Sequence, residues 1–280
     1  MGKQFNSQAY QLMKAVMAGD AAGVDAELAK NPDLDWQDSR DMTSLHHAVK
    51  VGRPDIAKKL LDAGANTRLK NNLGESPLTI AAEAGDEPSA IALLAKDTGA
   101  AQDKEENALP QAASQKHFGM VKLLIAAKFD VDHVPTAEKS GLMFSAENND
   151  IPTMTALLDA NANPDVRYMR GETPMIFATR KNAYDAVKLL IDRGANEKLW
   201  NIDGHTPELI ADKLGFSGIT GLIAQADDVR AAAEKRRIAG LAETIAAQKQ
   251  ARIDILKPFK NGTGHEFASP GKARFKPKIH

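Results

Sequence analysis

Three short segments of the chain contain residue types that serve nucleophilic catalysis, metal binding or phosphate binding. Gly215-Phe216-Ser217-Gly218 approaches the turn that presents a nucleophilic serine in hydrolases, but Ile219 replaces the second glycine of that motif and no strand is expected before it. His265-Glu266 begins like a zinc-peptidase helix, but Ser269 stands where the second histidine ligand belongs. Gly262-Thr263-Gly264 lacks the third glycine of a dinucleotide site. These residues favour a turn in the first case and a flexible segment in the other two.

The adjacent histidines His46 and His47 are the remaining candidates for a metal site. Neighbouring residues on a helix point about 100° apart, so the two rings would make a poor chelate. The chain has no cysteine, which excludes disulfides, thiolate zinc sites, iron–sulfur clusters and cysteine nucleophiles. We therefore expect no catalytic residue, no cofactor and no metal ion. Only chemistry without a local motif would leave an enzyme open.

The composition indicates closely packed helices in a soluble protein. Hydrophobic residues make up 43% of the 280 residues and charged residues 26%, whereas aromatic residues make up only 5%. Strands would favour more aromatic and β-branched side chains. No segment approaches the roughly 18 consecutive apolar residues of a membrane span. Residues 1–7 lack the apolar stretch of a secretory signal, so we expect a cytoplasmic location.

A repeat of about 33 residues runs through most of the chain. A small residue returns at spacings of 33, 33, 31, 33, 33 and 33 residues, and an apolar pair such as Leu60-Leu61 follows twelve and thirteen places later. A fixed period of this length is typical of stacked repeat proteins. The aligned small residues are Ala15, Ala48, Ala81, Ala112, Ser145, Ala178 and Ala211.

Residues at the ends of each repeated segment predict two short antiparallel helices per repeat. A Ser or Thr N-cap precedes the first helix, and three of these caps are followed by proline at the first helical position. Glycines such as Gly85 and Gly64 can supply the left-handed turn that ends each helix. Neither helix can bury its apolar face alone, so neighbouring repeats must cover it. The predicted N-caps are Thr43, Ser76, Thr173 and Thr206.

These residues resemble the ankyrin-repeat family. Thr43-Ser44-Leu45-His46-His47-Ala48 keeps the family's Thr-Pro-Leu-His-x-Ala signature except for the proline, and Ser76-Pro77-Leu78 keeps its core. Gly64-Ala65-Asn66 and Gly194-Ala195-Asn196 match the family's repeat ending. The resemblance covers residues 8–226 and implies an all-α ankyrin-repeat solenoid of about seven helix–turn–helix units with short β-hairpin fingers. It also implies a hydrogen-bonding role for His46 within its repeat.

The chain divides by composition into three parts. We expect the ankyrin-repeat array at 1–226, a C-terminal helix at 227–256 and a basic flexible tail at 257–280. The helix is expected to fold back on the last repeat for part of its length. The tail has six Lys or Arg residues against one acid, whereas the array has a net charge of −7. In the fourth repeat, whose step is 31 residues, 103–106 lacks a glycine for a tight turn, so we expect a distorted or shortened finger.

In the ankyrin family, the fingers and the outer end of the first helix line a concave groove. The resemblance therefore implies that this groove binds another protein. Carried over position by position, it implies partner contacts at Arg40, Met42, Lys50, Leu73, Met169, Arg170, Arg180, Lys181, Trp200, Ile202 and Lys213.

Two features of this set stand out. Trp200 aligns with Gln37 and Lys70, so we expect it on a finger, either exposed as a binding hot spot or packed against Met169 or Tyr168. Trp36 aligns with leucines of other repeats and is expected to be half-buried and structural. The second feature is a basic strip that would suit an acidic partner segment or form a solvated charged face, made of Arg170, Arg180, Lys181 and Lys213.

The function that the sequence favours is that of a protein–protein interaction adaptor or scaffold. A bacterial effector or host-directed protein that uses the same array in another cell is one alternative. Binding of nucleic acid or an anionic membrane through the basic tail is another. Nucleic acid is a poor candidate for the groove itself, because the array is acidic and phosphate binding needs positive charge.

Overall fold

The computed structural model describes residues 6–102, 108–134 and 139–226, together with 235, 238–240, 242–247 and 249–250. The chain separates into two compact parts, Met1–Asp227 and Asp228–His280. The predicted finger at 103–106, the tail at 257–280 and most of the predicted C-terminal helix lie outside the described residues. The tail's proposed contacts with nucleic acid or membranes therefore stay predictions.

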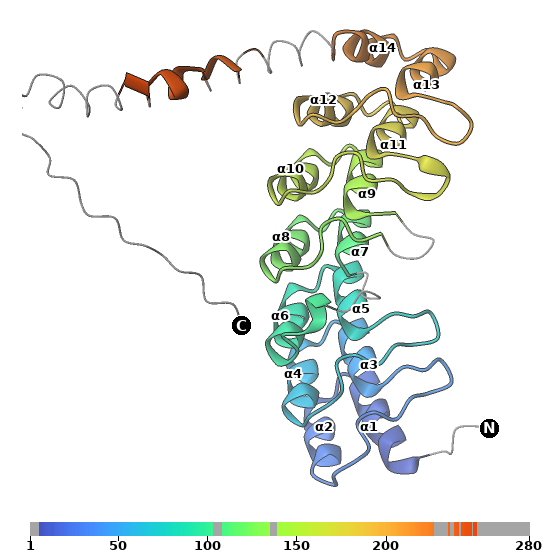
Figure 1. Cartoon of the computed structure of the whole chain (residues 1–280). Coiled ribbons are helices and arrows are strands. Elements are labelled where there is room, and N and C mark those ends of the chain that lie inside the picture. Colours follow the sequence, from blue (N-terminus) through green and yellow to red (C-terminus); the bar gives the residue numbers. More distant parts are fainter. Residues whose placement is uncertain are drawn as a thin grey trace, which may run out of the picture. The chain divides into compact units, whose positions relative to one another are not determined.

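In the first of these parts the described residues form a stack of seven helix pairs, which confirms the predicted all-α ankyrin solenoid (Figure 1). In order, the pairs are α1 (Ser7–Met17) and α2 (Ala21–Leu28), α3 (Ser44–Lys50) and α4 (Pro54–Asp62), α5 (Pro77–Ala84) and α6 (Glu87–Lys96), α7 (Ala108–Ser114) and α8 (Phe118–Ala126), α9 (Gly141–Glu147) and α10 (Ile151–Asp159), α11 (Pro174–Arg180) and α12 (Tyr184–Asp192), and α13 (Pro207–Leu214) and α14 (Ser217–Ala224). We call these pairs units one to seven. Two short 3-10 helices, η1 (Ala100–Gln102) and η2 (Met169–Gly171), lie in the connections.

The first helices of units two, three, six and seven begin where the sequence places their caps. The hydroxyl oxygens of Thr43, Ser76, Thr173 and Thr206 each accept a hydrogen bond from the backbone N–H three residues later, at 3.0–3.3 Å. Each bond satisfies a backbone donor that the first helical turn leaves without a partner. Gly85 and Gly215 end α5 and α13 in the left-handed conformation, with φ of 68° and 73°. Ser217 is therefore the first residue of α14, just after a turn between two helices.

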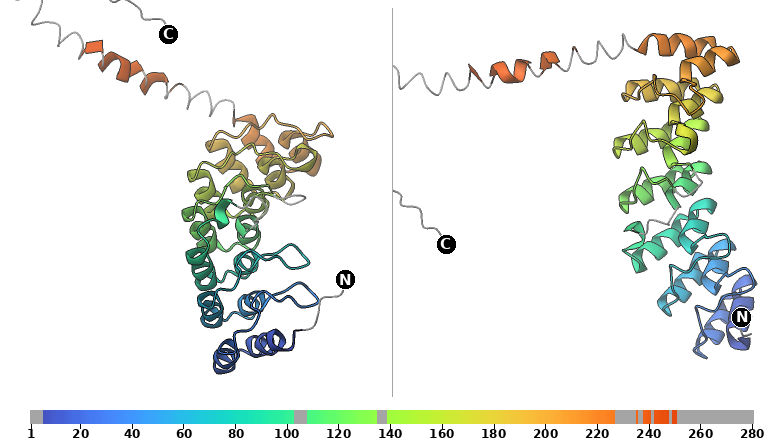
Figure 2. Two further views of the ribbon diagram at one scale, coloured as in Figure 1. Left: turned by 60° about the horizontal axis from the view of Figure 1, so that its bottom comes forward. Right: turned by 45° about the vertical axis from the view of Figure 1, so that its right-hand side comes forward.

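The two helices of each unit stack against their counterparts in the neighbouring units. The first helices form one row and the second helices another (Figures 1 and 2). One hydrophobic core runs between the rows from Leu12 to Ala226, and it includes the fully buried Leu60, Leu124 and Leu157. The burial of every unit thus depends on the next one.

α9 packs closely against α7 at Gly141. A Cβ atom built on Gly141 would lie only 2.7 Å from Cδ2 of Leu109 and 3.5 Å from Cβ of Ala113. Only glycine allows this approach without a shift of the neighbouring side chain, because interiors are packed close to crystal density. Among the described helices, none is long and apolar enough to cross a membrane.

Candidate partner-binding surface

The connections that precede the first helices form short fingers beside the stack (Figure 1). In four units a backbone hydrogen bond closes the finger across a five-residue span. The bonds run from Asp38 to Met42 (3.0 Å), Asn71 to Glu75 (2.9 Å), Tyr168 to Glu172 (2.9 Å) and Asn201 to His205 (3.2 Å), with the first residue donating through its N–H. Fingers are therefore present in units two, three, six and seven, but among the described residues they are tight turns without β-strands, and only the finger of unit six has a β-bridge, between Tyr168 and Glu172.

A side chain at the base holds the finger of unit seven in shape. The side-chain oxygen of Asn201, which is 1% exposed, accepts hydrogen bonds from the N–H groups of Asp203 and His205, both at 3.0 Å. Gly204 completes the turn with a φ of 73°. Asn71 and Asp38 make the corresponding bonds in units three and two. These turns fix the fingers locally, because Asx side chains replace backbone partners there.

Neighbouring fingers are also joined to each other. The N–H of Ile202 donates to the carbonyl of Arg170 at 2.8 Å, and the N–H of Asn72 donates to the carbonyl of Arg40 at 3.0 Å. Arg170 has a φ of 63°, which is uncommon for a residue with a side chain. The fingers of units two and three are therefore joined to each other, and so are those of units six and seven.

Large apolar side chains are exposed on these fingers. The exposed fraction is 58% for Trp200, 59% for Met169, 68% for Ile202 and 76% for Leu73. Of the two placements that the sequence leaves open for Trp200, the structure shows the exposed one. Arg40 and Lys50 are exposed as well.

Met42 is a correction to the predicted contact set. Its side chain is only 2% exposed and belongs to the hydrophobic core. The residue lies just before the Thr43 cap. Its N–H donates to Oδ1 of Asp38 at 3.0 Å, and this hydrogen bond holds the backbone at the base of the finger, where the chain enters α3. The family position is variable, but an apolar side chain here turns inward, and Met42 does not offer a contact to a partner.

The predicted basic strip is present, but acids compensate most of it. Arg180 pairs with Glu172, Arg170 with Asp203 at 2.8 Å, and Lys181 with Glu147 at 3.7 Å. Nζ of Lys213 lies 2.8 Å from Nε2 of His205. Since three of the four cations lie beside a carboxylate, the strip has little net positive potential to attract an acidic segment.

Three polar contacts recur at the same place in successive units, and the sequence motifs did not predict them. We call these contacts the charge ladder. In units five to seven, the residue just before the N-cap contacts the residue eight places later, at the end of the first helix. The pairs are Lys139 with Glu147, Glu172 with Arg180 and His205 with Lys213. The recurrence of polar residues eight apart at the 33-residue period was the available signal.

His46 joins units two and three. Its Nδ1 accepts from the Thr43 N–H at 3.1 Å, and its Nε2 lies 3.2 Å from the carbonyl oxygen of Glu75, to which it donates. The predicted bond within the repeat is accompanied by one to the next repeat. Burial lowers the pKa of His46 below its ordinary value of 6.5, and the hydrogen bond to Glu75 opposes this only in part. The neutral imidazole is therefore the form that the fold requires.

We expect the array to lose stability as the pH falls below about 6.5. In that range the unfolded chain binds a proton at His46 that the folded chain does not, so the free energy of unfolding decreases until the pH reaches the folded pKa. The loss is about 1.4 kcal/mol for each pKa unit between the two states. Urea unfolding at pH 7.5 and 5.5, for the wild type and His46→Asn, measures it.

Asn keeps an acceptor for the Thr43 N–H but does not titrate. The neighbouring pair of His47 and Asp38, whose side-chain atoms lie 3.0 Å apart, is present in both proteins. An equal pH dependence in the two proteins would contradict the role given to His46.

Within the part of the chain that the structure describes, no three His, Asp or Glu side chains gather in a way that could hold a metal ion. The features that the structure does show are a stack of helix pairs, a continuous core and two pairs of linked fingers with exposed apolar and charged side chains. They define a stacked repeat protein.

Comparison with protein families agrees with this class. The family model described as ankyrin repeats (many copies) matches residues 28–81, and the one described as ankyrin repeats (3 copies) matches residues 109–199 and 142–230. The chain therefore belongs to the ankyrin-repeat family.

The curated relatives include Neurogenic locus notch homolog protein 1 of Xenopus tropicalis, which is 33% identical over 174 residues, or 61% of this chain and 7% of that protein. The human protein of the same name is 34% identical over 137 residues, which cover 48% of this chain and 5% of the relative. The chain thus spans less than a tenth of the length of these relatives.

Two solved structures share the fold. The ankyrin repeat domain of Bcl-3, described as a unique member of the IkappaB protein family, has a TM-score of 0.67 at 24% identity and covers 76% of this chain and 97% of its own. The human ASB11 ankyrin repeat domain has the same TM-score and identity and covers 77% and 96%.

Proposed function

We propose that the protein is an adaptor that binds a partner protein through the fingers of units six and seven. We define the finger surface as Met169, Arg170, Trp200 and Ile202. Ankyrin repeats are generally protein–protein interaction modules, and this chain has the repeats in an unbroken stack.

The observation that supports this proposal most is the grouping of three exposed apolar side chains on two linked fingers. Met169, Trp200 and Ile202 are each more than half exposed, and the bond from the Ile202 N–H to the Arg170 carbonyl holds their backbones together. Exposed apolar groups with a polar rim mark interaction sites, and Trp is enriched among the residues that dominate binding energy. The exposed pair of Arg170 and Asp203 supplies part of that rim.

The charge ladder changes the kind of partner that we propose. Arg180 and Lys181 already lie beside Glu172 and Glu147, so they offer little free charge to an acidic segment. We therefore propose that an apolar element of the partner is the main anchor on the finger surface. Charged groups of the partner would contribute to orientation rather than to most of the affinity.

The experiment is a binding measurement with the full chain. A partner is first captured by the wild type and identified, and its Kd is then measured with purified proteins for the wild type and for Trp200→Ala/Ile202→Ala. Loss of a hot spot costs about 2 kcal/mol or more, which is roughly a thirty-fold increase in Kd. Neither side chain is buried, so we expect the variant to fold normally.

The matched control is Ile91→Ala/Phe118→Ala, which removes two exposed apolar side chains from the second helices α6 and α8. We expect this control to bind like the wild type. Equal binding by the finger variant, or equal loss in the control, would refute the finger surface as the binding site.

A further inference from the structure

Exposure divides the methionines of this chain into two groups. The chain has nine methionines, and all except Met1 are among the described residues. Of those eight, only Met169 and Met17 are exposed, with exposed fractions of 59% and 53%. The others are at most 3% exposed, and they are Met13, Met42, Met120, Met143, Met154 and Met175. A dissolved oxidant can therefore reach two of the eight thioether sulfurs, whereas the fold encloses the other six.

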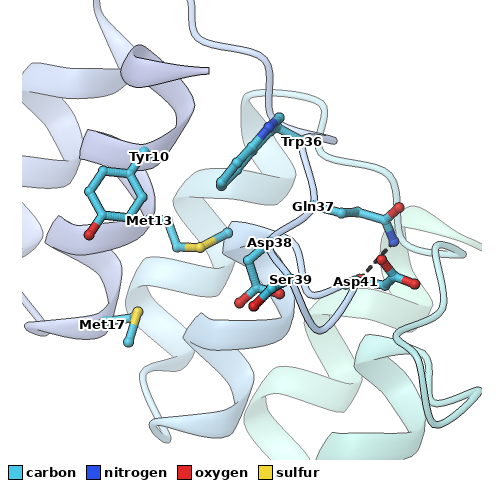
Figure 3. Close-up of a pocket in the computed structure, with 8 residues that line it drawn as sticks. All are labelled: Tyr10, Met13, Met17, Trp36, Gln37, Asp38, Ser39 and Asp41. Carbon is cyan, nitrogen blue, oxygen red and sulfur yellow. Dashed lines mark hydrogen bonds between the residues drawn. The ribbon is translucent and has the colours of Figure 1, made fainter. Parts of the chain in front are cut away.

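The two exposed methionines lie in different surroundings. Met169 is the first residue of η2 in unit six and belongs to the finger surface. Met17 is the last residue of α1 in unit one, and it lines an open pocket between α1 and the finger of unit two, together with Tyr10 and Trp36 (Figure 3). Trp36 is half-buried, as its alignment predicts. Because units one and six are far apart in the stack, Met17 is an internal control for any change at Met169.

The backbone of the unit-six finger does not depend on the Met169 side chain. The finger is held by hydrogen bonds from the Tyr168 N–H to the Glu172 carbonyl and from the Gly171 N–H to the Tyr168 carbonyl, both at 2.9 Å. Oxidation of a buried methionine places a polar sulfoxide in a core and disrupts it. At Met169 the sulfoxide would stay in water. Oxidation there would change the chemistry of the surface and leave the fold intact.

We propose that Met169 is a site of reversible oxidation by a peroxide, and that its sulfoxide weakens partner binding at the finger surface. The second part rests on the proposed function. The Met169 sulfur attacks one peroxide oxygen, the O–O bond breaks, and the other oxygen leaves as water with the proton of the transferred one. Sulfur loses two electrons and the peroxide gains them.

The sulfoxide weakens binding because it is a strong hydrogen-bond acceptor among apolar side chains. An apolar element of a partner that covers Met169, Trp200 and Ile202 would have to remove water from the S=O group without replacing its hydrogen bonds, and this is costly. Methionine sulfoxide reductases return the thioether, one enzyme for each sulfoxide epimer, so the change is reversible.

Peptide mapping of the full chain during treatment with hydrogen peroxide tests the site without a partner. We expect Met169 and Met17 to oxidise roughly tenfold faster than Met120 and Met154, because susceptibility follows exposure. In Met17→Leu, where Met169 is the one exposed target among the described methionines, we expect the same free energy of unfolding in urea before and after its oxidation. Oxidation of Met169 at the rate of the buried methionines, or a loss of stability in this variant, would overturn the proposal.

The effect on binding is measured with the partner identified by the experiment above. The wild type, Met17→Leu and Met169→Leu are treated with peroxide, and catalase removes the oxidant before the partner is added. Leucine has a similar volume and is not oxidised, so we expect the three untreated proteins to bind alike. After treatment, the Kd should rise about tenfold for the wild type and for Met17→Leu, and stay unchanged for Met169→Leu.

The outcomes separate this inference from the proposed function. Equal weakening in treated Met169→Leu would place the effect at another residue and refute the role of Met169. Unchanged affinity of the treated wild type, in a protein whose Trp200→Ala/Ile202→Ala variant loses binding, would refute the oxidation switch and keep the finger surface. Unchanged affinity of that double variant would refute the proposed function and with it the effect on binding, whereas the peptide map decides independently whether Met169 is the modification site.

Discussion

Replacement of Leu124 with alanine is expected to lower the free energy of unfolding of the array by about 2–5 kcal/mol. Leu124 lies on α8, is fully buried and belongs to the continuous core. α8 packs against α7 of its own unit and against α6 and α10 of the two neighbours, so the cavity left by the lost side chain weakens three contacts together. The cost includes both the lost burial and the cavity.

Urea unfolding followed by circular dichroism measures this change. The matched control is Leu73→Ala, which removes the same atoms from a side chain that is 76% exposed, and we expect a change below about 0.5 kcal/mol. Because Leu124 is in the middle of a stack held by nearest-neighbour contacts, we also expect a smaller m value, as the two halves begin to unfold separately. Similar changes in the two variants would contradict the placement of Leu124 in the shared core.

Replacement of Arg180 with alanine is expected to destabilise the array by about 1–3 kcal/mol. The cause is the loss of an ion-pair partner for Glu172. The Glu172 side chain is only 9% exposed, and its carboxylate accepts hydrogen bonds from Arg180 and, at 3.3 Å, from Nδ2 of Asn201 in the next finger. Without Arg180, a nearly buried negative charge keeps only the amide as a described partner, and such a charge is costly.

The matched control is Arg193→Ala. Arg193 also pairs with an acid, Asp159 of the preceding unit, at 2.8 Å, but the side chain of that acid is 63% exposed. Pairs of that kind contribute about 0–1 kcal/mol, so we expect a small effect. The double variant Arg180→Ala/Glu172→Gln should recover part of the loss, because the remaining amide has no charge to bury. Failure of the double variant to recover stability would contradict the explanation by an unpaired carboxylate.

The link between Arg180 and the Trp200 finger determines which residues can test the binding surface. A loss of partner binding in Arg180→Ala would combine a missing contact with a disturbed finger, because Glu172 connects Arg180 to Asn201 at the base of that finger. Trp200 and Ile202 are exposed and can be changed without that disturbance. For this reason the proposed binding experiment relies on them and not on the cations of the groove.

The sequence alone predicts the fold, because the signals for it are local and repeated. The caps at Thr43, Ser76, Thr173 and Thr206 act on backbone donors within three residues, so they need no knowledge of the neighbouring units. The 33-residue period then determines that identical apolar faces stack on one another. The class of the protein follows from these two signals, whereas the fingers were implied by the resemblance to the ankyrin family.

Which residues are available to a partner was decided only by the tertiary structure. Met42 lies at a variable family position, but the return of the finger to the stack directs it into the core. The sequence predicts that Arg180 is available to an acidic partner, but in the folded unit it pairs with Glu172. Tyr10 and Trp36 belong to different units and face one pocket only because the units stack. Exposure and charge compensation depend on groups brought together by packing, and the repeat period does not encode those groups.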